Sequence, residues 1–91
     1  MSTNERDMTL RARRDLAQRL GLSEDNIREE SIEQTDFPDA ALGAPIEDEM
    51  SAQVITPGWR IRLKAQDQTY EYRTGGNRLR LVNFNGQNYR I

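Results

Sequence analysis

An apolar stripe with helical spacing is the first regular pattern in the chain. Its members recur every four residues: Met8, Ala12, Leu16 and Leu20. Residues at this spacing share one face of an α-helix, and Gly21 follows the last of them, where a helix end favours a left-handed residue. The pattern predicts a helix over residues 7–20, preceded by a flexible N-terminus at residues 1–6.

The last third of the chain alternates between apolar and polar residues, which is the period of a β-strand with one buried face. The apolar members of this alternation are Trp59, Ile61, Leu63, Ala65, Tyr70, Tyr72, Leu79 and Leu81. They predict three strands, near residues 59–65, 69–74 and 78–84. Asn85-Gly86 is a strong signal for a two-residue hairpin, so we expect residues 87–91 to return as a short edge strand.

The middle of the chain has a mixed pattern. Residues 27–37 combine isoleucine and threonine, which favour strands, with glutamates, which favour helices. We predict a bulged strand there, with a helix as the alternative, and Pro38 ends it. Residues 38–58 follow as a long irregular segment that contains proline and glycine but no clear helical or strand period.

Together these elements predict an α+β fold, with one N-terminal helix packed on an antiparallel β-meander of three to five strands. The expected core includes Leu16, Leu20, Ile61, Leu63 and Leu81. At 91 residues the chain fits one small domain over residues 1–91, with one modest core.

The composition limits the catalytic mechanisms and metal sites that are possible, because the chain contains no cysteine and no histidine. This excludes disulfides, thiolate nucleophiles, histidine acid–base catalysis and metal sites built from either residue. The three consecutive acids Glu47-Asp48-Glu49 lack the alternating ligand spacing of a calcium loop. We therefore expect no enzymatic activity, no bound metal and no cofactor.

No apolar run approaches the roughly 20 residues that a membrane-spanning helix needs. The N-terminus also lacks the apolar stretch of a secretory signal. We therefore expect a cytoplasmic protein that makes no membrane contact.

The charges are segregated along the sequence. Residues 1–22 carry a net charge of +2, residues 23–50 carry −9 and residues 51–91 carry +5. We expect the acidic middle to fold within ion-pair range of arginines from the two ends. The alternative is a basic sheet face that binds nucleic acid, but the sequence pI near 5.1 and the inward tyrosines argue against it.

The long irregular segment carries our candidate site. It combines prolines and glycines, which restrict or specify the backbone conformation, with four expected apolar anchors: Leu42, Ile46, Val54 and Trp59. A loop built in this way can be ordered, with an exposed rim that contacts a partner. The candidate contact residues are Glu47, Asp48, Glu49, Met50 and Trp59, with residues 47–50 as a mobile tip. Two alternatives stay open: a loop that only closes the core, and a small-ligand site beneath residues 38–58.

Four stretches carry a family resemblance: DLAQRLGLSEDNI, FPDAALGAP, AQVITPGWRIRL and YEYRT. In this order, over residues 15–82, the chain resembles a family of small, largely uncharacterised bacterial proteins. The family pattern reads WPDxSLGCP, then AQVxTPGYxIxL, then YxYHT. Ala44 stands where this pattern has cysteine and Arg73 where it has histidine, so no function that rests on those side chains carries over.

The resemblance implies a helix-plus-sheet layout similar to PepSY and cystatin-like domains. Such layouts serve as protein-binding or peptidase-regulating domains, which is an analogy at the level of the fold. We therefore expect a non-catalytic binding module that acts as a monomer on an unknown protein partner.

Overall fold

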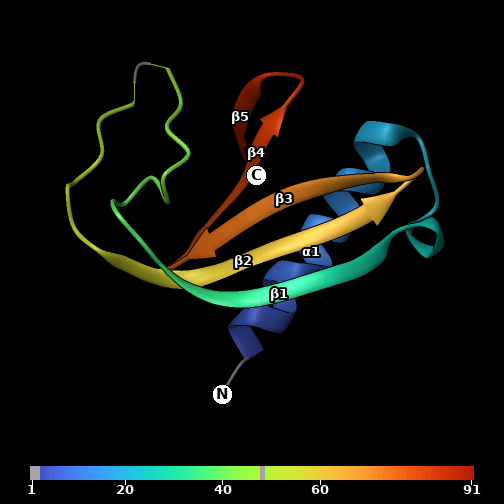
Figure 1. The fold of residues 1–91 in the computed structure, drawn as a ribbon, viewed down its shortest axis with the longest axis horizontal. Helices are drawn as coiled ribbons and strands as arrows, with labels where there is room; N and C mark the ends of the chain where they lie inside the picture. The colour runs from blue at the N-terminus through green and yellow to red at the C-terminus, as the bar shows by residue number, and fades with distance from the viewer. Residues whose placement is uncertain (1–2, 48) are drawn as a thin grey trace.

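The computed structural model describes residues 3–47 and 49–91, with side chains from Glu5 onward. The N-terminal helix α1 (Thr3–Leu20) packs on a five-stranded antiparallel sheet (Figure 1). The strands are β1 (Arg28–Phe37), β2 (Thr56–Ala65), β3 (Gln68–Gly75), β4 (Arg78–Phe84) and β5 (Gln87–Arg90). They lie in chain order across the sheet. The predicted α+β fold, with one helix on a β-meander, is confirmed.

Helix α1 begins earlier than the apolar stripe predicts. Residues 3–6, which we expected to be part of a flexible N-terminus, are helical; residues 1–2 lie outside the described residues. The helix ends as expected, because Gly21 has φ +69° and the Leu22 amide donates to the carbonyl oxygen of Ala17 at 2.9 Å.

Residues 27–37 form a strand rather than a helix, and it is bulged. The pairing of β1 with β2 shifts register between Glu29 and Ser31. Strand β2 begins at Thr56, so Pro57 and Gly58 belong to the sheet and not to the irregular segment, which covers residues 38–55. A Cβ added at Gly58 would lie 1.9 Å from the Thr74 carbonyl oxygen, so glycine permits this close strand approach.

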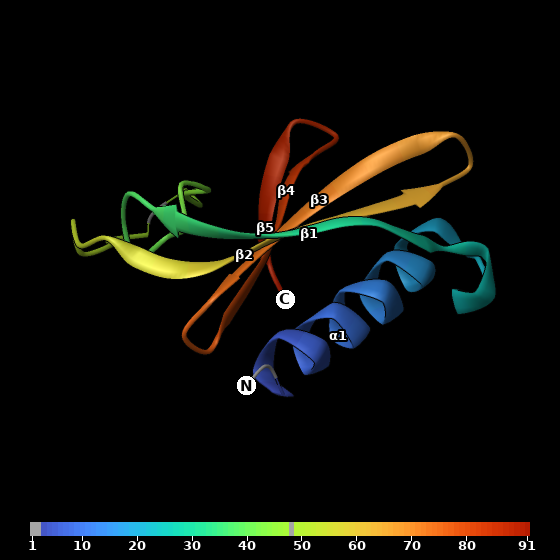
Figure 2. The same cartoon turned by 60° about the horizontal axis from the view of Figure 1, so that its bottom comes forward.

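The main core lies between α1 and one face of the sheet (Figure 2). Leu16, Ile61, Leu63 and Leu81 are fully buried there, whereas Leu20, at the end of the helix, packs against this core and is only partly buried. The Tyr72 hydroxyl donates to Asp15 of α1 at 2.7 Å. Burial and this carboxylate raise the pKa of Tyr72, so the hydroxyl stays protonated as a donor.

Strand β4 leaves β3 near its end, and the β4–β5 hairpin stands out from the rest of the sheet (Figure 2). The pairing of β3 with β4 stops at Glu71 and Val82. The next residue, Asn83, has φ +54°, and its amide donates to the Asn88 side chain at 2.8 Å rather than continuing the ladder. The left-handed backbone at Asn83 therefore lies where the β3–β4 pairing has ended and where the β4–β5 pairing shifts register, between Leu81 and Phe84.

Candidate interaction surface

The irregular segment folds onto the sheet face opposite α1. Successive side chains of a strand point to opposite faces, so Gly75 lies on the other face from its core-facing neighbour Thr74. Leu42 packs directly against Gly75: a Cβ atom added at Gly75 would lie only 2.8 Å from Cδ2 of Leu42. Phe37, Ala41, Leu42 and Ala44 are buried on this side. The helix therefore covers one face of the sheet, and the loop covers one end of the other face.

A tight backbone structure shapes the start of this loop. Oδ1 of Asp39 accepts hydrogen bonds from the amides of Ala41 and Gly43, both at 3.0 Å. Leu42 and Gly43 then adopt φ values of +61° and +67°. A buried leucine in the left-handed region is uncommon, and here the burial of its side chain and the Asp39 cap oppose the backbone strain.

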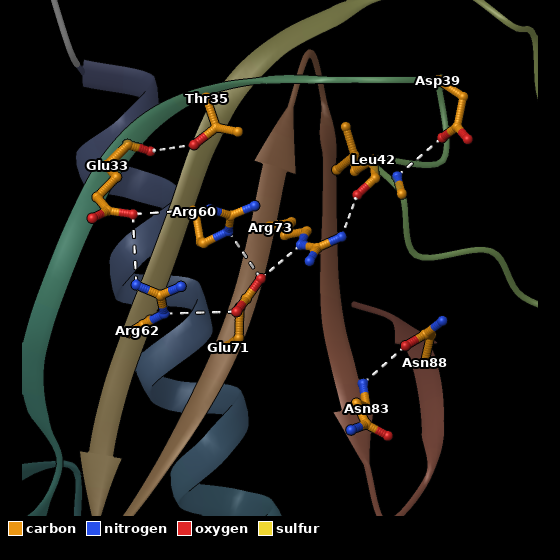
Figure 3. A network of polar contacts seen from close by, with 11 residues as sticks. Glu33, Thr35, Asp39, Leu42, Arg60, Arg62, Glu71, Arg73, Asn83 and Asn88 are labelled. Atoms are coloured by element: carbon orange, nitrogen blue, oxygen red, sulfur yellow. Dashed lines mark hydrogen bonds and ion pairs between the residues drawn. The ribbon is translucent and has the colours of Figure 1, made fainter.

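Three arginines of β3 and β4, Arg73, Arg78 and Arg80, hold the loop by donating to its carbonyl oxygens; we call them the arginine clamp. Nη1 of Arg73 donates to Leu42 at 2.9 Å (Figure 3). Nη1 of Arg80 donates to Ala44 at 3.2 Å, and Nη1 of Arg78 donates to Ala40. The bonds to Leu42 and Ala44 satisfy carbonyl oxygens that the packing of the loop shields from water, whereas the bond to Ala40 is exposed.

Arg80 also forms the most buried ion pair of the described residues. Its side chain is 2% exposed, and its Nη1 and Nη2 contact the two carboxylate oxygens of Glu49, which is 13% exposed, with Nη1 to Oε1 at 2.6 Å. The hydrogen bonds from Arg80 lower the pKa of Glu49 from 4.5 to about 2, against the opposing effect of burial. Glu49 is therefore a carboxylate at neutral pH.

Beyond the loop, the same sheet face carries a row of paired charges. Glu33 of β1 and Glu71 of β3 lie on either side of Arg60 and Arg62, which contact both of them (Figure 3). Arg73 also donates to Glu71, at 2.7 Å. With Glu49 and Arg80, this row confirms that the acidic middle lies within ion-pair range of arginines from the C-terminal part.

The returning part of the loop is exposed and apolar. Met50 is 98% exposed, Val54 51% and Ile55 70%; we call these three residues the apolar rim. Our prediction that Val54 anchors the loop is wrong, since its side chain faces solvent. The burial of Leu42 agrees with its predicted role as an anchor, and Ile46 is partly exposed. Trp59 does not anchor the loop, because it lies in β2 and packs against the helix-side core.

The structure separates the residues predicted as contacts. Glu47 and Met50 are exposed, Glu49 points to Arg80, and Asp48 lies outside the described residues. Trp59 packs against the helix-side core, so it lies on the opposite sheet face from Glu49. The sequence analysis did not name Ile55 as a contact residue. The pair Val54-Ile55 could have indicated an exposed apolar side chain, because neighbours in an extended segment point to opposite sides.

Asn88 connects the loop to the bent β4–β5 hairpin. Its Oδ1 accepts from the Asn83 amide at 2.8 Å, and its Nδ2 donates to the Pro45 carbonyl oxygen at 2.9 Å. One side chain therefore stabilises both the bend in β4 and the position of the loop.

Neither a metal centre nor a membrane span is apparent in residues 3–47 and 49–91. No cluster of three or more acidic side chains there could hold a metal ion. Helix α1 is not apolar enough to cross a bilayer.

Comparison with known proteins places the chain in a family. No curated protein and no solved structure matches it. Residues 9–83, from the middle of α1 to the bend in β4, match the family described as Domain of unknown function (DUF8738). Since this match covers most of the chain, the protein belongs to that family.

Proposed function

We propose that this protein is a non-catalytic protein-binding module whose contact surface is the apolar rim. One observation carries the proposal: Met50, Val54 and Ile55 are exposed on a loop whose other part is fixed to the sheet. Single exposed apolar residues are common on protein surfaces, but three within six positions of one ordered loop favour a contact site.

The way the loop is held supports binding with a low entropic cost. Association must offset the ordering of side chains and loops at the interface. Here the arginine clamp and the Asp39 cap already order the first part of the loop, and the amide of Ala40 donates to Ala52 of the returning part at 3.0 Å. Much of the backbone order is therefore present before a partner arrives.

The side chains of the rim define the chemistry of the partner. Valine and isoleucine are stiff at χ1, and methionine adapts to irregular surfaces, so together they suit an apolar pocket. Exposed acids flank them, Glu47 in the loop and Asp36 beside the start of β2. The partner that fits is a protein with an apolar pocket and a basic border. The resemblance to cystatin-like domains that the sequence motifs imply makes a peptidase the class to test first.

The test compares variants in a pull-down from extract of the native host. The triple variant Met50→Ser, Val54→Ser, Ile55→Ser removes the rim, and Leu10→Ser removes an exposed leucine on α1 as the matched control. We expect the triple variant to lose at least about tenfold of the specifically captured protein, with stability nearly unchanged, because exposed side chains contribute little to folding. Undiminished capture by a folded triple variant would refute the proposal.

Among the described residues, the basic side chains of the sheet face opposite α1 do not favour the nucleic-acid alternative. A platform needs unpaired basic side chains along one face. Arg80 is buried beneath the loop, and Arg60 and Arg62 are paired with glutamates. The space beneath the loop, where a small ligand was the other alternative, contains the buried side chains of Phe37 and Leu42.

A further inference from the structure

A pocket of about 300 Å³ lies where β4 begins, beside the end of β5. Three arginines line it, Arg78 and Arg80 from β4 and Arg90 from β5, together with one carboxylate, Glu49. The register of the sheet brings two of them together, since Arg80 is paired with Arg90. Among the described residues, the ionised side chains that line the pocket therefore carry a net charge of +2.

Part of this positive charge is removed from water. Arg80 is 2% exposed, so its charge is weakly screened and acts strongly on nearby groups. Burying an arginine is unfavourable unless an anion compensates, and Glu49 compensates the buried charge of Arg80. No further acidic side chain lines the pocket among the described residues, so Arg78 and Arg90 have no carboxylate of their own there. Arg78 and Arg90 are exposed at the pocket and available to a second anion.

The donors that remain can bind such an anion. A guanidinium has five N–H donors, and the side chain of Arg78 uses one of them on Ala40. Nε of Arg90 lies 3.5 Å from Glu49, which is an ion pair without a tight hydrogen bond. The pocket already holds one carboxylate on two nitrogens of Arg80, so it demonstrates the geometry by which a guanidinium binds an oxyanion.

We propose that this arginine pocket binds a second, external oxyanion, the carboxylate or phosphate group of a ligand. Arg78 and Arg90 contact the anion, and Arg80 supplies a buried positive charge behind it. The site is separate from the apolar rim, and its occupancy does not depend on the protein-binding proposal.

The experiment is a titration of the whole protein with inorganic phosphate at constant ionic strength, followed by NMR. We expect saturable shifts at the amides of residues 77–79 and 90–91. Arg78→Gln and Arg90→Gln should each weaken binding about tenfold, since each removes charge-assisted contacts. The matched control Arg14→Gln, an exposed arginine on α1, should bind as the unmodified protein does.

Two further variants sharpen the result. Glu49→Gln removes the internal carboxylate that competes with the ligand, so it should raise phosphate affinity several-fold if the loop stays folded. The triple rim variant should bind phosphate unchanged, which separates a failure of this proposal from a failure of the protein-binding one.

A parallel titration with acetate distinguishes a carboxylate from a phosphate site, and saturation by either supports the proposal. Shifts that rise linearly with both anions, or affinity unchanged in Arg90→Gln, would overturn it.

Discussion

Arg80 is the residue that contacts both a backbone carbonyl and a carboxylate of the loop. It is a nearly buried charge that bonds to the Ala44 carbonyl and to the carboxylate of Glu49. Its Nε is buried without a hydrogen-bond partner among the described residues. Removing one member of a buried pair leaves the other uncompensated, which costs more than the intact pair contributes. We therefore expect a change in either member of the Arg80–Glu49 pair to weaken the attachment of the loop.

Acid should weaken this attachment in a defined pH range. The folded-state pKa of Glu49 is depressed from 4.5 to about 2, so the stability it contributes is fully present above about pH 4.5 and is lost as the pH falls towards 2. We expect Glu49→Gln to be less stable than the unmodified protein at pH 7 by about 1–3 kcal/mol. This difference should shrink between about pH 4.5 and 2.

Urea denaturation at a series of pH values measures this difference. The control is Glu47→Gln, which removes an exposed carboxyl from the same loop. Its stability should stay close to that of the unmodified protein at every pH. A Glu49→Gln difference that persists unchanged at pH 2 would contradict the assigned role of the carboxylate.

The sequence could not reveal this pair. Strand alternation correctly separated Arg80 from the apolar face, but an outward position in a strand does not show whether a loop covers it. Glu49 stands among acids that resemble a solvated tip, and its partner lies 31 positions away. Such a contact is set by how the loop packs, for which the local pattern has no signal.

Among the elements, the helix and the loop differ in what they contribute to stability. Leu16 on α1 lies in the main core, whereas Leu42 packs over Gly75 on the other face. We expect Leu16→Ala to lower the free energy of unfolding by about 2–5 kcal/mol. Leu42→Ala should affect the loop first, by raising the hydrogen-exchange rates of its amides with a smaller loss of global stability.

Native-state hydrogen exchange combined with denaturant unfolding distinguishes the two effects. In Leu42→Ala, the amides of Leu42 and Ala44, which donate to Asp39 and Ala41, should exchange faster while those of β2 and β3 stay protected. Equal acceleration in the loop and in these central strands would show that the loop and the sheet unfold as one unit.

The sequence predicted these elements best where the determining contacts are local. The stripe from Met8 to Leu20 specifies α1, and Asn85-Gly86 specifies the β4–β5 turn; both signals lie within the element itself. The assignment of Pro57 and Gly58 to a loop was wrong, because their place in β2 depends on pairing with β1 and on close approach to Thr74. The bend at Asn83 depends on Asn88 in the neighbouring strand.

At the scale of the whole molecule, ion pairs join the parts of the chain that carry opposite charge. Arg13 of α1 contacts Glu29 of β1 at 3.1 Å, and Arg62 of β2 contacts Glu33 of β1 at 3.6 Å. Apart from Arg80 with Glu49, these pairs are at least partly exposed, and each contributes roughly 0–1 kcal/mol.

Salt should therefore have a modest effect on global stability. Raising the NaCl concentration from about 0.05 to about 0.5 M screens the exposed pairs, and we expect a loss of at most about 1–2 kcal/mol. Thermal or urea unfolding in a salt series measures it, with sulfate avoided because it also strengthens apolar burial. A loss of several kcal/mol would mean that the charged row on the sheet contributes much more than exposed pairs usually do.

The connection between β1 and β2 has a consequence for the order of folding. Strands β2 to β5 are joined by two-residue turns, whereas residues 38–55 separate β1 from β2. Closing a longer loop costs more entropy before its contacts form, so the β2–β5 hairpins should form first and β1 should join late.

Contacts of the loop would then be missing from the folding transition state. Leu42→Ala should speed unfolding with little change in the folding rate, whereas Leu63→Ala, in β2, should slow folding. Stopped-flow folding and unfolding in urea measure both rates, and slower folding in Leu42→Ala would reverse the proposed order. If the order holds, the surface that carries the apolar rim is the last part of the molecule to form and the first to be lost when the protein unfolds.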